Sequence, residues 1–242
     1  MFKNVNSIAD KWRHIIPPAI FNVLRKPVNA ILGPVCFSLE TGHLRSSFKS
    51  LAVDKKGGPL PWYTYPAIEW LLLRDLSGTK VLEFGCGQST KFWANKGATV
   101  IGFEDDWKWY CDLYADQALY NKPVNIHFLK KDAIITNEVI VAVADIKFDY
   151  ICVDGLHRGS AAAQAFGMMG EDTIVIIDNS DGNHVHLGKG YNEMASKDFG
   201  LNRLDFIGYP PGNCRPHCTS IYFSPFNKKL NNKTNNPNPN LV

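Results

Sequence analysis

The 242-residue sequence has no long uninterrupted apolar run, no dense pattern of cysteines and little net charge. Its most apolar stretch, residues 15–37, contains four prolines together with Arg25 and Lys26, so it does not predict a membrane-spanning helix. The six cysteines are widely spread, which argues against a disulfide framework and favours a reducing, cytoplasmic setting. No secretory leader pattern is evident.

The small net charge of +3 is unevenly distributed, because residues 1–60 carry nine Lys/Arg against three Asp/Glu. This basic segment could meet an anionic substrate or a membrane surface, or it could be a solvated face. Its excess of charge is modest, and the N/D-P-P-Y/F motif of many base-modifying enzymes is missing, so no nucleic-acid partner is predicted. Residues 19–32 could form an amphipathic segment that docks on the protein itself or lies on a membrane.

The apolar pattern predicts one α/β domain over residues 61–226, preceded by a basic N-terminal helical extension over 1–60 and followed by a disordered Asn-rich tail over 227–242. Continuous apolar runs alternate with segments long enough for helices, as in a parallel sheet covered on both faces. The last two runs are joined by a short connection, which favours an antiparallel pair. We therefore expect a Rossmann-like, doubly wound, seven-stranded and mostly parallel sheet with an antiparallel edge. The runs are 80–84, 99–103, 125–129, 148–153, 173–178, 203–209 and 219–223.

The first run ends in "KVLEFGCGQST", where Gly85 and Gly87 form a turn into a predicted helix. Glycine permits backbone angles and close ligand approach that a Cβ would prevent. A dinucleotide-binding turn would have a third glycine, but that position is Thr90. Glu83 places a negative charge where a pyrophosphate would approach, so the turn favours a ligand with a cationic portion.

Two further acids end the next two runs. Glu104 lies 21 residues after Glu83, an offset at which an acid commonly binds ribose hydroxyls, and Asp132 could meet an adenine amino group or cap the helix that follows. Because parallel strands end at one edge of a sheet, the three acids form a predicted row along that edge.

The ordered motifs "VLEFGCGQST", "VIGFEDD", "FLKKDA", "FDYICVDG" and "TIVIIDN" resemble those of class I S-adenosylmethionine-dependent methyltransferases over residues 60–224. The resemblance implies that S-adenosylmethionine is the cofactor, with its methionine portion over the glycine turn, its ribose at Glu104 and its adenine near Asp132. The predicted cofactor-binding residues are Glu83, Gly85, Gly87, Ser89, Thr90, Glu104, Asp132, Ala133 and Tyr63. A weaker similarity links "PWYTYPAIEWL" to bacterial methyltransferases of glycans and small molecules.

Residues after the fourth and fifth runs are candidates for the chemistry. Asp154 with Asp178 and Asn179 offers oxygen ligands that suit Mg²⁺, and this set resembles the cation-dependent O-methyltransferases. Where that family has a lysine base, this chain has His157, which we predict to be a general base alongside Asp154. The same acids could instead cap turns, so metal binding is left open.

The sequence thus predicts a methyltransferase that acts on a hydroxyl of a sugar, a glycan precursor or another small metabolite. Two alternatives stay open: an N-methyltransferase for a small amine, and a non-catalytic protein that binds S-adenosylmethionine. Trp62, Tyr63 and Tyr65 could form a lid with Arg45 and Lys49, or pack beneath a helix. The segment "CRPHC", residues 214–218, is interpreted as a strand connection rather than a zinc site. The sequence does not predict the oligomeric state.

Overall fold

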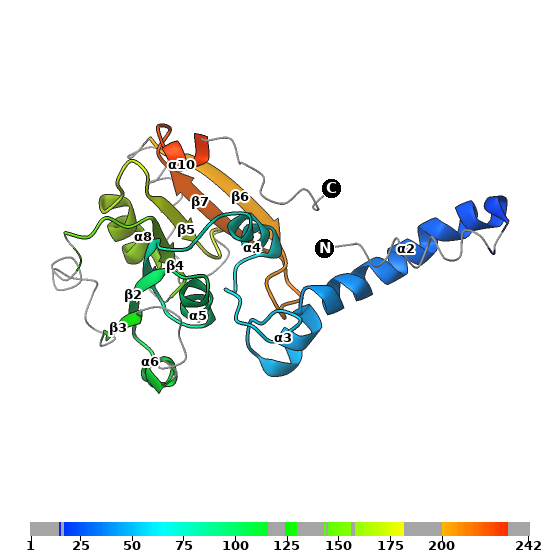
Figure 1. Cartoon of the computed structure of the whole chain (residues 1–242), viewed down its shortest axis with the longest axis horizontal. Coiled ribbons are helices and arrows are strands. Elements are labelled where there is room, and N and C mark those ends of the chain that lie inside the picture. The colour runs from blue at the N-terminus through cyan, green and yellow to red at the C-terminus, as the bar shows by residue number, and fades with distance from the viewer. Residues whose placement is uncertain are drawn as a thin grey trace.

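The computed structural model describes residues 15, 17–115, 124–129, 143, 145–155, 158–181 and 200–231. Within these ranges the chain forms a seven-stranded sheet with helices on both faces (Figure 1). Each strand lies within two residues of the apolar run that predicts it. The strands are β1 (Lys80–Phe84), β2 (Thr99–Glu104), β3 (Val124–Phe128), β4 (Tyr150–Val153), β5 (Ile174–Ile177), β6 (Asn202–Gly208) and β7 (His217–Phe223).

The strand order is β3-β2-β1-β4-β5-β7-β6. Strands β1 to β5 pair in parallel, whereas β7 runs antiparallel to both β5 and β6. This confirms the predicted mostly parallel sheet with antiparallel pairing at one end. The carboxyl ends of the five parallel strands and the beginning of β7 consequently lie at the same edge.

Helices cover the sheet in two layers because its central strands are apolar on both sides. Alternate residues of β1 belong to different cores: Val81 packs with Trp93 of α5, whereas Leu82 packs with Phe166 of α8. Trp93 is fully buried, as are all four residues of β4. The helices of the domain are α4 (Tyr65–Leu72), α5 (Gln88–Asn95), α6 (Trp107–Ala115), α8 (Arg158–Gly167) and α10 (Lys228–Asn231).

The N-terminal part contributes a long helix, α2 (Pro18–Glu40), and a short one, α3 (His43–Lys49). Figure 1 shows α2 extending away from the sheet, and Phe37 near its end packs edge-on against Tyr65 at 5.0 Å between ring centroids. The prediction that residues 19–32 dock on the protein itself is wrong for the described side chains from residue 23 onward, because most of them are exposed. The helix continues through Pro27 and Pro34 without ending.

Among the described residues, no helix is long and apolar enough to cross a membrane. Association of residues 19–32 with a membrane surface stays a prediction. The predicted domain boundary at residue 60 is likewise untested, but Ala52 and Leu60, on either side of residues 53–59, are buried in the sheet's core. The helix predicted near Asp132 and residues 232–242 of the Asn-rich tail lie outside the described residues. The prediction of disorder is wrong at the start of the tail, because Asn227 is buried and Lys228–Asn231 form α10.

Candidate functional site

A cavity of about 890 Å³ lies at the edge where the parallel strands end. Its floor comes from the turns after β1, β2, β4 and β5, and its walls come from α3 and from the connection between β6 and β7. Ligands of open parallel sheets bind at this edge. The cavity is therefore the candidate site, and α3 of the N-terminal part completes it.

The glycine turn after β1 forms part of the floor. Gly85 has a φ of +91°, and a Cβ at this position would lie 2.5 Å from the backbone of Gly155 in the turn after β4. Gly87 is different, because a Cβ there would meet no protein atom within 4 Å. Gly85 thus serves the packing of two turns, whereas the open space at Gly87 is available to a ligand.

Glu83 lies beneath this turn and does not line the cavity. Its carboxylate accepts a 2.6 Å hydrogen bond from the Thr90 hydroxyl, which in turn accepts one of 3.0 Å from the Gly87 N–H. Only 1% of Glu83 is exposed, and burial raises its pKa from 4.5 to about 8 despite the hydrogen bond from Thr90. In this structure Glu83 positions the turn from below, and direct contact with a ligand remains a prediction.

Glu104 lines the cavity at the end of β2. One carboxylate oxygen accepts a 2.7 Å hydrogen bond from the Cys86 N–H, and the other accepts bonds of 3.0 and 2.7 Å from the N–H groups of Asp105 and Asp106. Burial raises its pKa, and these backbone donors oppose the rise. Because a carboxylate can accept about four hydrogen bonds, Glu104 is held rigidly and keeps acceptor capacity for a ligand hydroxyl.

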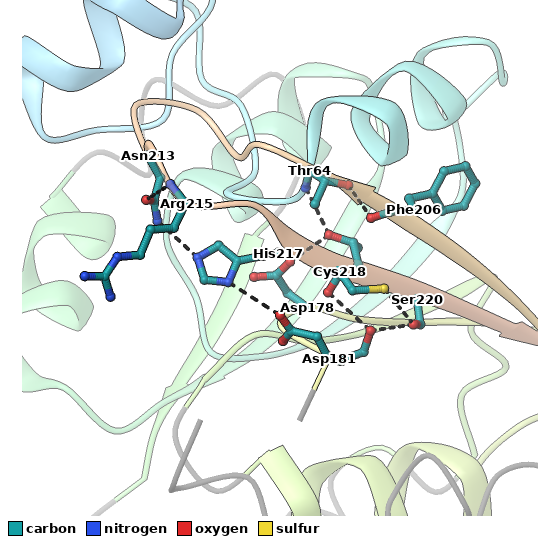
Figure 2. Close-up of polar contacts among 11 residues, drawn as sticks. Thr64, Asp178, Asp181, Phe206, Asn213, Arg215, His217, Cys218 and Ser220 are labelled. Carbon is teal, nitrogen blue, oxygen red and sulfur yellow. Dashed lines mark hydrogen bonds and ion pairs between the residues drawn. The ribbon is translucent and has the colours of Figure 1, made fainter. Parts of the chain in front are cut away.

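Asp154 and Asp178 line the cavity after β4 and β5. Asp154 forms a 2.9 Å ion pair with Arg158 at the start of α8. Asp178 accepts a 2.8 Å bond from the Thr219 hydroxyl, whose oxygen accepts the Thr64 N–H (Figure 2). Burial raises the pKa of both acids; Arg158 opposes the rise for Asp154, whereas the charge of Asp154 raises the pKa of Asp178 further.

His217 lines the same cavity, although the sequence predicts only a strand connection at residues 214–218. Figure 2 shows its imidazole between Asn213 and Asp181. Its Nε2 lies 3.2 Å from the Asn213 amide nitrogen, and its Nδ1 lies 3.9 Å from a carboxylate oxygen of Asp181. The predicted antiparallel pairing of the last strand could have indicated this position. A strand that runs antiparallel to β5 begins at the edge of the sheet where the parallel strands end, and His217 is the first residue of β7.

The other predicted site residues divide into three groups. Ser89 and Asn179 line the cavity, and Asn179 has a φ of +51°, which asparagine tolerates better than most residues. Thr90 and Tyr63 are fully buried and do not line it. Asp132, Ala133 and His157 lie outside the described residues.

Of the residues predicted to form a lid, Trp62 lines the cavity and contacts Trp109 of α6 edge-on, at 6.3 Å between ring centroids. Tyr65 is buried near the end of α2, and neither Arg45 nor Lys49 reaches the cavity. The part of α3 that forms the wall is instead its serines, Ser46 and Ser47. Of the five residues predicted to form a lid, only Trp62 therefore borders the cavity, together with Trp109, Ser46 and Ser47.

Comparisons with known proteins found no matching family model and no matching curated protein. Solved structures do match at 15–18% identity. An O-methyltransferase from Bacillus cereus in complex with SAH is 18% identical, with a TM-score of 0.47 over 63% of this chain and 76% of that one. The O-methyltransferase TomG from Streptomyces achromogenes, in complex with SAM, is 15% identical, with a TM-score of 0.48 over 77% and 87%. Magnesium protoporphyrin IX methyltransferase from Synechocystis, with bound SAM, is 18% identical, with a TM-score of 0.46 over 66% and 77%.

The two glycines of the turn should respond differently to alanine. Gly85→Ala is expected to lower the free energy of unfolding by about 3 kcal/mol or more, because the methyl group meets the Gly155 backbone and the positive φ is strained. Gly87→Ala should change it by less than about 1 kcal/mol, because nothing lies near its Cβ. Urea denaturation of both variants checks this, and equal stabilities would contradict it.

Glu83 should make stability fall as the pH rises. Below pH 4.5 its carboxyl is protonated in the folded and unfolded states, whereas between 4.5 and about 8 the folded state binds the proton more strongly. The stability that Glu83 contributes by binding the proton more strongly in the folded state falls from about pH 4.5 and is lost once the pH has risen through about 8. Between pH 5 and 9 the wild type should lose on the order of 3 kcal/mol more than Glu83→Gln, as measured by urea denaturation. Glu69→Gln, at an exposed position, is the control, and parallel profiles for wild type and Glu83→Gln would contradict the assignment.

Proposed function

We propose that this protein is an S-adenosylmethionine-dependent methyltransferase that acts on a hydroxyl of a sugar, a glycan precursor or a comparable small metabolite. The observation that carries the proposal is the pairing of the open glycine turn at Gly87 with the rigidly held Glu104 on the same cavity floor. S-adenosylmethionine needs both features: open space for its methionine portion and an acceptor for its ribose hydroxyls.

The cofactor occupies the half of the cavity over β1 and β2. Its methionine portion passes over Gly85 and Gly87, and its ribose hydroxyls donate to the remaining acceptor capacity of Glu104. The aromatic face of Trp109 suits an adenine ring, and Asp132 and Ala133 stay the predicted adenine contacts. The acids lining the cavity favour the cationic sulfonium over a diphosphate, because a cation offsets the free energy of keeping carboxylates ionised in a buried site.

The acceptor occupies the half over β4 and β5. Methyl transfer is an in-line displacement that requires an aligned, deprotonated acceptor. Asp154, whose ionised form Arg158 favours, accepts a hydrogen bond from the substrate, and Asp178 is a second polar group for the substrate to bind. Two such groups, with the serines of α3 on the wall, suit a polyhydroxylated substrate. The sequence-predicted base, His157, directly precedes Arg158.

The described side chains do not fit a magnesium site. Asp154 is already paired with a fixed cation, Arg158. Among the described residues, no group of three His, Cys, Asp or Glu side chains is arranged to hold a metal ion. A divalent cation held by Asp154, Asp178 and Asn179 would have to displace Arg158 from Asp154, so the proposed reaction uses no metal.

Isothermal titration with S-adenosylhomocysteine tests the cofactor site. The wild-type chain is expected to bind, and Gly87→Ala should bind at least about 10-fold more weakly, because its methyl group fills space that the ligand needs. Gly167→Ala, at an exposed glycine with equally open surroundings, is the matched control and should bind like the wild type. Absence of binding by the wild type would remove the proposal.

An acceptor screen with labelled methyl donor tests the reaction and its metal independence together. We expect methylation of a polyhydroxylated compound at a rate that EDTA changes by less than about twofold, because Arg158 supplies the positive charge. Added Mg²⁺ after EDTA is the control. An EDTA-sensitive rate restored by Mg²⁺ would contradict the metal-free site, and a methylated amine would identify the N-methyltransferase alternative.

A further inference from the structure

His217 reaches the cavity because β7 runs against the parallel strands. The register pairs Ile177, the last residue of β5, with Ser220, so the beginning of β7 extends past the end of β5. A 2.9 Å bond from the Ser180 N–H to the Cys218 carbonyl fastens this extension to the turn after β5. His217 is therefore held on the acceptor side of the cavity, with only 14% of its side chain exposed.

The hydrogen bonds around His217 assign its tautomer. The Arg215 backbone N–H donates a 3.0 Å bond to the amide oxygen of Asn213, and only the oxygen of an amide can accept it (Figure 2). The Asn213 amide nitrogen, a donor, must then face His217 Nε2 at 3.2 Å. Nε2 consequently carries the lone pair and Nδ1 carries the proton.

The protonated Nδ1 faces the Asp181 carboxylate at 3.9 Å. A carboxylate beside Nδ1 keeps the imidazole in this tautomer and stabilises the imidazolium that forms when Nε2 takes a proton. Among the described residues, Asp178, the ion pair of Asp154 with Arg158 and the Cys214 thiol also line this side of the cavity, and Arg215 lies two residues after Asn213 in the connection between β6 and β7. His217 thus combines a lone pair on Nε2, which accepts the Asn213 N–H in this structure, with an orienting acid and a place on the cavity wall.

We propose that His217 is the general base of the reaction and that Asp181 is its positioning residue; this inference rests on the proposed function. The acceptor hydroxyl replaces the Asn213 amide at Nε2 and transfers its proton there. The hydroxyl oxygen forms the bond to the methyl carbon, and the carbon–sulfur bond breaks with its electron pair going to sulfur. The products are the methyl ether, the neutral thioether and an imidazolium, which then releases its proton to water.

The tautomer is tested without any acceptor. In ¹⁵N-histidine-labelled full-length protein, the resonances of His217 are assigned by their loss in His217→Gln. We expect the Nδ1–H tautomer in the neutral imidazole, and Asp181→Asn should lower the pH at which His217 titrates, because a stabilising negative charge is removed. An Nε2–H tautomer, or an unchanged titration in Asp181→Asn, would overturn the inference.

Turnover of the hydroxyl compound found in the screen tests the role. His217→Gln should lower kcat about 100-fold or more while S-adenosylhomocysteine affinity stays within twofold, and Asp181→Asn should shift the acidic limb of the kcat–pH profile. His127→Gln, in β3 away from the cavity, is the matched control and should keep the wild-type rate.

The outcomes separate the two proposals. An active wild type whose rate falls only in His157→Gln, or in neither variant, overturns the role of His217 and leaves the proposed function standing. A wild type that neither binds S-adenosylhomocysteine nor methylates any acceptor overturns both.

Discussion

The contact on which the site depends is the close approach of two backbones, at Gly85 after β1 and Gly155 after β4. A Cβ at Gly85 would lie 2.5 Å from Gly155, so the two turns can meet only where Gly85 has no side chain. Because β1 and β4 are neighbours in the sheet, this contact joins the half of the cavity with Glu104 to the half with Asp154 and Asp178. Alignment of a cofactor with an acceptor would rest on that junction.

Burial of carboxyl groups around the junction gives the cavity its electrostatic character. Glu83, Glu104, Asp154 and Asp178 all have raised pKa values, and in each case loss of solvent is the largest cause. Their partners differ, which separates their roles. Glu104 is held by backbone N–H groups and Asp154 by a guanidinium, both of which favour the ionised form. The Thr219 hydroxyl also favours ionised Asp178, but the like charge of Asp154 opposes it.

The two helices of the N-terminal part differ in how they contact the domain. Helix α3 forms a wall of the cavity, and Gly212 in the opposite connection lies so close to its backbone that a Cβ would approach Ser47 N to 2.9 Å. Helix α2 instead extends outward (Figure 1), and its exposed side chains include Leu24, Val28 and Ile31. One end of this segment is thus part of the site, and the other presents an apolar surface to its surroundings.

The strands, the glycine turn and the acids at strand ends could be predicted from the sequence, because apolar runs, glycine and strand termini are local features. The sequence also implied the antiparallel end of the sheet, because the connection before β7 is too short for a crossover helix. The tertiary structure was needed to show where side chains point and what they meet. Tyr63 is buried in a core and Glu83 lies beneath the turn, so neither lines the cavity, and the layers that cover them come from other parts of the chain. His217 joins the cavity only through the register of β7 against β5, a contact between residues about 40 positions apart that no local pattern contains.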